Sequence, residues 1–273
     1  MSVDLDAYFE RIGYDGRAAP TLETLARLHE LHPQAIPFEN LSPFLGEEIP
    51  LDIASLQDKL VARGRGGWCF EQNLLFAHVL REIGFDLVTL AARVRWNAPP
   101  GEARPRSHML VLVKLSQGDY IADVGFGGLV LTAPIRLAAN IEQQTPHEAF
   151  RLGACEGMYL LEAHVAGAWQ PLYAFDLHEQ TLPDYEVSNW YLAHHPKSQF
   201  VTGILAARSE PQKRHALRGG RYTLHRLGQP GESRAIESVA DFKQTLSGPF
   251  GIRLPNSPEL DLRLRSLLAT PPA

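Results

Sequence analysis

The spacing of apolar residues divides the chain into stretches of different periodicity. Up to about residue 85, apolar side chains recur every three or four positions, as they do on one face of a helix. These faces are formed by Leu5, Tyr8, Phe9 and Ile12, by Leu22, Leu25, Leu28 and Leu31, by Leu56, Leu60 and Val61, and by Phe70, Leu74, Leu75, Val79, Leu80 and Ile83. The pattern predicts a helical bundle over residues 1–85.

From about residue 86 the pattern changes to alternation or to short continuous apolar runs, which are typical of strands. The runs cover Leu87–Trp96, His108–Leu115, Tyr120–Phe126 and Met158–Phe175. Turn sequences such as residues 97–101 and Ala166–Gly167 interrupt the pattern. We therefore expect antiparallel strands over residues 86–190, arranged as a barrel or a strongly curved sheet.

The remainder, residues 191–273, mixes both patterns. It predicts a strand at Val201–Ala207, a hairpin around Arg218–Arg221 and a helix at Val239–Leu246. This mixture is typical of a third, smaller α/β unit. The fold class that follows is α+β, with an N-terminal helical bundle, a central antiparallel β-barrel and a C-terminal α/β unit.

Composition excludes several classes of protein. The 273 residues carry a formal net charge of -5 and no dense run of Lys or Arg, which argues against nucleic acid or an anionic membrane as partner. Residues 1–6 are acidic and contain no long apolar stretch, so we expect no signal peptide, no membrane span and a cytoplasmic location. In that compartment the two cysteines, Cys69 and Cys155, should be free thiols, and Cys155 is interpreted as a turn residue without a role.

Cys69 lies where a nucleophile would be built. Residues 65–73, Arg-Gly-Gly-Trp-Cys-Phe-Glu-Gln-Asn, bring it to the first turn of the last predicted helix of the bundle, and Gly84 is the expected end of that helix. A free thiol has a pKa of about 8.5, and the unpaired N–H groups of a helix N-terminus favour the thiolate. The alternative is that Cys69 is a small apolar residue of the core.

A thiolate nucleophile needs a base, and the chain offers eleven histidines. His108 is favoured because it begins an apolar strand directly after a polar loop, where a side chain can face a cleft. The others are set aside. His29 and His32 fall on a predicted helix and His194 and His195 precede a proline, positions that are more often at the surface or at a helix cap.

Asp123 lies inside the apolar run that follows, and a buried carboxylate is costly unless it is paired. A hairpin with a four-residue turn or a bulge would return the chain from His108 to about the level of Asp123. Asp123 could then accept from one imidazole nitrogen while the other faces Cys69, as in a nucleophile–base–acid triad. Two alternatives stay open. His108 could be a hydrogen-bonded residue at a strand end, and Asp123 could pair with an arginine such as Arg93 or Arg95.

No metal or nucleotide motif competes with this interpretation. The chain has no paired Cys-x-x-Cys, no His-Glu-x-x-His, no Walker lysine loop and no Gly-x-Gly-x-x-Gly between a strand and a helix, so we expect no metal site. Residues 125–128, Gly-Phe-Gly-Gly, look like a nucleotide loop, but the sequence after them continues extended. A tight turn beside Asp123, with Phe126 lining the cleft, fits better.

The same segments resemble the arylamine N-acetyltransferase family. Residues 65–73 resemble the family's signature around its acyl-carrying cysteine. Ser107–His108 and residues 122–127 resemble its histidine and aspartate segments, respectively. Residues 36–41 (Ile-Pro-Phe-Glu-Asn-Leu) resemble an N-terminal element of the family. The likeness is collinear from about Tyr8 to Phe250. Trp68 departs from it, because the family more often has tyrosine at this position.

The resemblance implies a papain-like Cys-His-Asp triad between the helical bundle and the barrel, with the α/β unit as a lid. It also implies acetyl-CoA as the donor co-substrate and an arylamine, hydrazine or arylhydroxylamine as the acceptor. By resemblance, an apolar wall for the acceptor would be formed by Phe38, Val94, Phe126 and Phe200, and the path of the acyl group and coenzyme A would pass Ser107 and Gly125. Each of the four apolar residues would equally fit a plain core.

The implied function is two-step acetyl transfer through Cys69. The resemblance also implies a role in xenobiotic metabolism and allows assembly as a homo-oligomer. Three alternatives stay open: an amide synthase acting on a dedicated biosynthetic substrate, a thiol hydrolase or peptidase with the same triad, and a catalytically silent binding module. The sequence leaves open the physiological acceptor, the acyl-chain preference and the contacts of coenzyme A.

Overall fold

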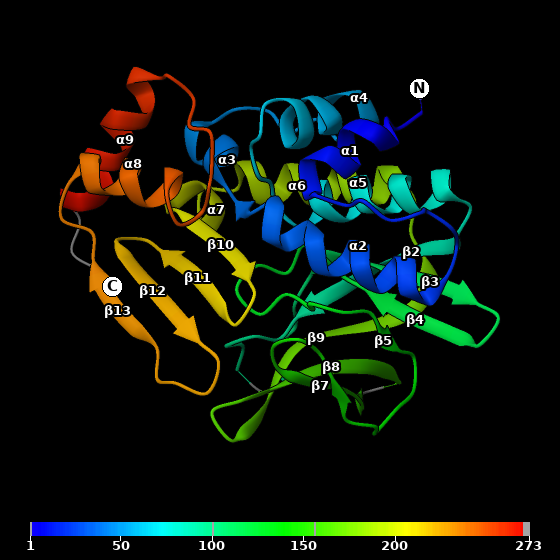
Figure 1. The fold of residues 1–273 in the computed structure, drawn as a ribbon. Coiled ribbons are helices and arrows are strands. Elements are labelled where there is room, and N and C mark those ends of the chain that lie inside the picture. The colour runs from blue at the N-terminus through cyan, green and yellow to red at the C-terminus, as the bar shows by residue number, and fades with distance from the viewer. Residues whose placement is uncertain (1, 100, 156, 270–273) are drawn as a thin grey trace.

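The computed structural model describes residues 2–99, 101–155 and 157–269. In Figure 1 a layer of helices lies on one side of a long curved sheet, and a second sheet with its own helices stands beside both. The strand pairs of both sheets are antiparallel. The predicted α+β class, with a helical bundle, a barrel and an α/β unit, is confirmed.

The helical layer is built from the N-terminal part of the chain. Its elements are α1 (Leu5–Ile12), α2 (Leu22–Ala35), α3 (Leu41–Leu45), α4 (Ile53–Leu56), the π-helical segment η1 (Gln57–Ala62) and α5 (Cys69–Ile83). Gly84 ends α5 with a φ of 103°, a left-handed conformation that favours glycine. The predicted helix and its end are confirmed. In the described part of the chain, no helix is long and apolar enough to cross a membrane.

The long sheet has the strand order β5-β4-β3-β2-β9-β8-β7-β6 and forms a nearly closed barrel. Its strands are β2 (Asp86–Val94), β3 (Arg106–Leu115), β4 (Gly118–Ala122), β5 (Ile135–Arg136), β6 (Gln143–Gln144), β7 (Ala149–Cys155), β8 (Met158–Val165) and β9 (Ala168–Glu179). The two edge strands are joined where the side-chain amide of Gln143 bonds the backbone N–H and carbonyl of Arg136, at 2.7 and 3.0 Å. These bonds replace part of the ladder that a closed barrel would have.

Strand β3 is buried on both faces, which explains why its sequence is apolar without alternation. Met109, Val111 and Val113 pack among the helices, and Leu110 and Leu112 point into the barrel. Helix α5 packs against this strand. The first residue of α5 lies next to the start of β3, because Cys69 Sγ is 3.8 Å from the carbonyl oxygen of Ser107.

The third unit contains a five-stranded sheet of order β1-β10-β11-β12-β13. Its elements are β1 (Phe38–Glu39), α7 (Gln199–Thr202), β10 (Leu205–Glu210), β11 (Lys213–Arg218), β12 (Arg221–Arg226), β13 (Glu232–Ala235), α8 (Val239–Ser247) and α9 (Pro258–Ala269). Helix α6 (Leu182–His194) lies in the helical layer, where its residues Tyr185 and Ala193 share a core with α5 (Figure 1). Leu41 and Phe44 of α3 pack in the core of the third unit with Phe242. Residues 38–45 therefore belong in space to the C-terminal unit. The expected boundaries at residues 85 and 190 stay predictions.

Three local expectations were wrong. The run Tyr120–Phe126 is not one strand, because β4 ends at Ala122 and the chain then leaves the sheet. The turn between β3 and β4 has two residues rather than four, because Leu115 pairs with Gly118. Residues 201–202 lie in helix α7 instead of a strand. Apolar runs do not distinguish a strand from a buried loop or a short helix that follows it.

The burial of both faces of β3 predicts that neighbouring side chains on it are both costly to truncate. Met109→Ala and Leu110→Ala should each lower the free energy of unfolding by about 2–5 kcal/mol, because each leaves a cavity in a different core. Lys114→Ala, at an exposed position of the same strand, should change it by less than about 0.5 kcal/mol. Urea unfolding measures all three. A neutral result for Met109 or Leu110 would contradict the two-sided burial of β3.

Candidate active site

The start of α5 is fixed by the residues around Cys69. Trp68 precedes the helix in an extended conformation, and its backbone N–H donates to the Glu71 carboxylate at 3.1 Å. The first helical hydrogen bond runs from the Gln72 N–H to the Trp68 carbonyl, at 3.0 Å. Cys69 is the first helical residue, so its own N–H lies outside the helical ladder, at the end of the helix where the dipole favours negative charge.

The two glycines before Trp68 are required by close contacts. A Cβ on Gly66 would lie 2.1 Å from the Pro37 carbonyl oxygen, and a Cβ on Gly67 would lie 2.7 Å from Glu71 Oε2. Gly67 also forms a parallel bridge with Phe38. The glycine pair thus lets the chain pass between β1 and the start of α5, which brings Cys69 to its position.

Cys69, His108 and Asp123 come together where the helical layer meets the barrel. His108 lies on β3 and Asp123 directly follows β4, and His108 Nε2 is 2.7 Å from Asp123 Oδ2. The Sγ atom of Cys69 lies 3.8 Å from the Ser107 carbonyl oxygen, on the residue before His108. Because Nε2 faces Asp123, Nδ1 is the imidazole nitrogen available to Cys69. All three side chains are buried.

Charge outweighs burial in the His108–Asp123 pair. Burial alone would lower the pKa of His108, but the charge and hydrogen bond of Asp123, with smaller contributions from Cys69, raise this pKa to about 10. Burial alone would raise the pKa of Asp123, but the charge and hydrogen bond of His108 and a bond from Asn73 bring it below its usual value. Near neutral pH the pair is therefore an imidazolium and a carboxylate. This is the state beside which a thiol ionises most readily.

The arginines considered as alternative partners of Asp123 bind elsewhere. Arg93 donates to the Arg104 carbonyl, and Arg95 donates to the Glu102 carbonyl at 2.6 Å. The buried carboxylate is therefore paired with His108.

Asn73, one helical turn after Cys69, ties α5 to both other segments of the site. Its Nδ2 donates to the Met109 carbonyl at 2.7 Å and to Asp123 Oδ1 at 2.9 Å, and its Oδ1 accepts the Val124 N–H at 3.0 Å. Asn73 lies in the segment 65–73, but no role was expected for it. Its spacing of four residues from Cys69, on the same helix face, was the available signal.

His29 and His32 were wrongly expected at the surface or at a cap, because both are fully buried. His32 bonds the Tyr8 hydroxyl at 2.8 Å and Gln72 Oε1 at 2.6 Å, and His29 Nε2 accepts the backbone N–H of Asp123 at 3.0 Å. Burial lowers the pKa of His29 to about 4 and that of His32 to about 3, so both are neutral. Their spacing continues the apolar stripe of α2, which is the signal that could have placed them inside.

Aromatic rings surround the imidazole of His108. Phe126 packs edge-on against it with the ring centroids 5.1 Å apart, and Tyr173 of β9 lies at 4.8 Å. Burial, followed by the charge of Asp123, raises the pKa of Tyr173 well above its usual value, so its hydroxyl stays neutral. Val94, the last residue of β2, lies opposite Tyr173 in the sheet. Tyr173 was missed because it lies in an apolar run with no distinguishing neighbour.

A second aromatic group is formed by Phe38 and Phe200, whose ring centroids are 6.4 Å apart. Phe200 also packs edge-on against Trp68, at 5.1 Å. The segment that carries Phe200 is held by Asn40, whose side-chain amide donates to the carbonyls of Phe200 and Gly203 at 2.8 and 2.7 Å. The element 36–41 therefore connects the helical layer to the third unit.

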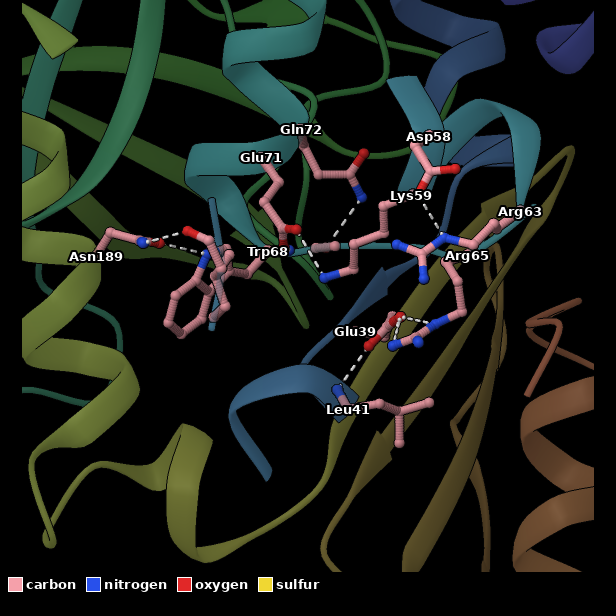
Figure 2. A network of polar contacts seen from close by, with 12 residues as sticks. Glu39, Leu41, Asp58, Lys59, Arg63, Arg65, Trp68, Glu71, Gln72 and Asn189 are labelled. Atoms are coloured by element: carbon pink, nitrogen blue, oxygen red, sulfur yellow. Dashed lines mark hydrogen bonds and ion pairs between the residues drawn. The ribbon is translucent and has the colours of Figure 1, made fainter. Parts of the chain in front are cut away.

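Two buried ion pairs hold the segment before Cys69 (Figure 2). Arg65 pairs with Glu39 at 2.7 Å, and Lys59 Nζ with Glu71 Oε1 at 2.7 Å. Removing one partner of a buried pair leaves a charge without compensation, so such pairs fix a geometry more surely than they add stability. The Arg65–Glu39 pair joins the segment 65–73 to the segment 36–41.

At the edge of the same network the indole N–H of Trp68 donates to Asn189 Oδ1 on α6 at 3.0 Å (Figure 2). Asn189 in turn donates to the Ile49 carbonyl at 2.9 Å. The Trp68 side chain therefore anchors α6 beside the start of α5, directly before Cys69.

The protein thus has an α+β fold with a buried group of Cys69, His108 and Asp123 between the helical layer and the barrel. A family model described as N-acetyltransferase matches residues 21–258. The arylamine N-acetyltransferase of Mycobacterium tuberculosis (strain H37Rv) is 42% identical to this chain, over 100% of this chain and 98% of that relative. The arylamine N-acetyltransferase of Escherichia coli (strain K12) is also 42% identical, over 92% of this chain and 90% of that relative. This chain therefore belongs to the arylamine N-acetyltransferase family.

Solved structures agree with this assignment. The arylamine N-acetyltransferase of Mycobacterium smegmatis has a TM-score of 0.93 and 39% identity, covering 98% of this chain and 100% of that one. The Mycobacterium marinum enzyme in complex with CoA has a TM-score of 0.93 and 39% identity, covering 97% and 99%.

Gly125 predicts a sharp steric limit behind Cys69. A Cβ on Gly125 would lie 2.8 Å from the Cys69 Cα and 2.9 Å from Asn73 Nδ2, so Gly125→Ala should push the turn away from α5. This displacement should slow iodoacetamide alkylation of Cys69 at least about tenfold, because a misplacement of about 1 Å can cost 10²-fold in rate. Gly128→Ala is the matched control, because a Cβ there meets nothing within 4 Å. Equal alkylation rates in the two variants would contradict the close approach.

The His108–Asp123 pair predicts a pH window of stabilisation. The pKa of His108 is raised from 6.5 to about 10, so its contribution is complete below 6.5 and is lost as the pH rises through 10. The pKa of Asp123 lies below 3.8, so its contribution is present above 3.8 and is lost at lower pH. The loss of unfolding free energy in His108→Gln, about 3–5 kcal/mol, should be largest between these limits and decline toward pH 10. Urea unfolding across pH measures it, and a loss that does not change with pH would mean that folding does not raise the pKa of His108.

Proposed function

We propose that this protein is an acetyl-CoA-dependent arylamine N-acetyltransferase that carries the acetyl group as a thioester on Cys69. The proposal rests on one observation: a cysteine at a helix start lies beside a buried imidazolium–carboxylate pair. The relative from M. marinum, solved with CoA, supports the choice of donor. We propose arylamines, hydrazines and arylhydroxylamines as acceptors. The relative from Salmonella typhimurium, named as an N-hydroxyarylamine O-acetyltransferase as well as an arylamine N-acetyltransferase, supports the first and the last of these.

In the first step the Cys69 thiolate attacks the carbonyl carbon of the acetyl thioester. The bond from this carbon to the sulfur of coenzyme A breaks, and the departing thiolate takes the Nδ1 proton of the His108 imidazolium. Asp123 keeps the proton on Nε2 and so fixes the tautomer that remains. The backbone N–H of Cys69, outside the helical ladder, is the proposed donor to the oxyanion.

In the second step the amine attacks the acyl carbon and gives its proton to Nδ1 of His108, which is now neutral. The bond between this carbon and Cys69 Sγ breaks, the amide is released, and the thiolate–imidazolium pair is restored. Donor and acceptor thus use the same sulfur in turn.

We propose Phe38, Val94, Phe126 and Phe200 as the apolar wall of the acceptor site. The packing of Phe126 on the His108 ring and the contact of Phe38 with Phe200 support this assignment. Val94 is supported through Tyr173, its sheet partner, which packs on His108.

We propose that the acyl group and coenzyme A pass Ser107 and Gly125. The support is their contact with the nucleophile, since the Ser107 carbonyl lies near Cys69 Sγ and Gly125 lies against the Cys69 backbone. A cytoplasmic location, a role in xenobiotic metabolism and assembly as a homo-oligomer belong to the same proposal.

The covalent intermediate is the first test. Acetyl-CoA without acceptor should add one acetyl group to the peptide that contains Cys69, because the thiolate is the nucleophile. Peptide mass spectrometry measures it, with Cys155→Ser as a variant that should label normally and Cys69→Ser as one that should not form the thioester. Acetylation at another residue only would remove the proposal.

The fate of this adduct separates the remaining functions. Added arylamine should discharge the acetyl group as amide, and initial rates at several donor concentrations should give parallel double-reciprocal lines. Rapid loss of the adduct to water without amine would indicate a thiol hydrolase. A stable adduct that discharges only to an elaborate amine would indicate an amide synthase, and no adduct would indicate a binding module.

Asp123→Asn tests the orienting acid. The change keeps the volume of the side chain but reverses the preference for the protonated imidazole nitrogen, so Nδ1 no longer faces Cys69 in the required state. Acetyl transfer should fall by about 10⁴-fold, the loss known for the equivalent change in the serine-protease triad. A thermal melt controls for folding. A folded variant that transfers acetyl groups at close to the parent rate would show that Asp123 is structural.

A further inference from the structure

His29 reaches the triad from helix α2, outside the segments that carry the nucleophile, base and acid. Its Nε2 accepts the backbone N–H of Asp123 at 3.0 Å. The ladder between β3 and β4 ends with the pair Val111 and Ala122, so Asp123 is the first residue beyond it. The imidazole of His29 thus supplies the acceptor that a neighbouring strand would otherwise provide.

The surroundings of His29 keep it in the accepting form. Burial lowers its pKa to about 4, an effect that the charge of Asp123 only partly opposes. The other titratable neighbour, His32, is also neutral, and the ring of Phe76 packs edge-on at 5.8 Å. Nε2 is therefore unprotonated near neutral pH, and the proton of the ring lies on Nδ1.

We propose that His29 is a positioning residue of the active site, whose imidazole holds the main chain of Asp123 so that the carboxylate stays in contact with His108. The proposal rests on the proposed function, in which Asp123 orients the base. It assigns to His29 an effect on the reactivity of Cys69 that is transmitted through Asp123 and His108.

The geometry around Asp123 supports this role. Its carboxylate is held by Asn73 and by the Gly125 N–H at 2.9 Å each, but both of these bonds act on Oδ1. The bond to His29 acts on the main chain, at the point where the sheet no longer fixes it. The main chain is held again at the next residue, where the Val124 N–H donates to Asn73 Oδ1 at 3.0 Å, so the His29 bond fixes the peptide of Asp123 itself. Without it this peptide can tilt, and Oδ2 would shift out of line with His108 Nε2. The strength of a hydrogen bond falls steeply with such misalignment.

Three variants test the proposal by alkylation of Cys69 with iodoacetamide across pH. His29→Leu removes the acceptor and should shift the midpoint of the alkylation profile upward by about one pH unit, because a weaker Asp123–His108 pair favours the thiolate less. His29→Gln offers an amide oxygen as acceptor and should retain most of the parent profile. Leu28→Ala is the control, since it truncates a buried neighbour on α2 and should lower the melting temperature without moving the midpoint.

Acetyl transfer gives the second readout. His29→Leu should lower kcat by up to about 10²-fold, as expected for a small misplacement of a triad member, while leaving KM for the acceptor nearly unchanged. In an Asp123→Asn background the same change should cause no further loss, because the carboxylate that His29 positions is then absent.

Two results would overturn the proposal. One is a His29→Leu protein whose alkylation midpoint and kcat match those of Leu28→Ala, which would make His29 purely structural. The other is a full additional loss from His29→Leu in the Asp123→Asn background. If His29→Leu does not fold, His29→Phe keeps a ring against Phe76 and carries the same expectations. Because alkylation needs no acetyl-CoA, failure of the proposed transferase function would leave this test readable.

Discussion

The buried carboxylate of Asp123 is the constraint on which the site depends. An isolated charge at this depth would be far too costly, so the fold must surround it with partners. It does so with the imidazolium of His108, the amide of Asn73 and the backbone N–H of Gly125. These partners come from a strand, a helix and a turn, and each must be in register for the charge to be tolerated. The same placement of these three segments brings Cys69 to the imidazole, so folding stability and the proposed chemistry require the same arrangement.

Close backbone contacts maintain this register at the start of α5. Gly66 passes the Pro37 carbonyl, Gly67 passes the Glu71 carboxylate, and Gly125 lies against the Cys69 backbone, at distances where any Cβ would clash. The third unit is tied to the same point by Phe38 of β1, which forms a bridge with Gly67, and by Phe200 of α7, which packs on Trp68. Cys69 therefore lies where all three structural units meet. A shift of any one of them would be transmitted to the first turn of α5.

The sequence was sufficient for the parts of this arrangement that depend on local pattern. The helix from Cys69 to Gly84 and the strand that begins near His108 follow from periodicity, glycine positions and the change from polar to apolar sequence. The burial of His29 and His32 was not recognised, because a polar residue on an apolar stripe is usually discounted, and only contacts distant in sequence show what satisfies it. The packing of residues 38–45 in the C-terminal unit is likewise a long-range pairing that no local pattern reports.

The ionisation of His108 links the two halves of the proposed reaction. Asp123 is the main reason that its pKa stands near 10, but the hydrogen bond and charge of Cys69 contribute as well. When Cys69 becomes a neutral thioester, both contributions from the sulfur disappear while Asp123 stays. The pKa of His108 must then fall, which favours the neutral form of its imidazole. This neutral form is the base that the incoming amine requires. Acylation itself thus prepares the base for the second step, and release of the amide restores the first state.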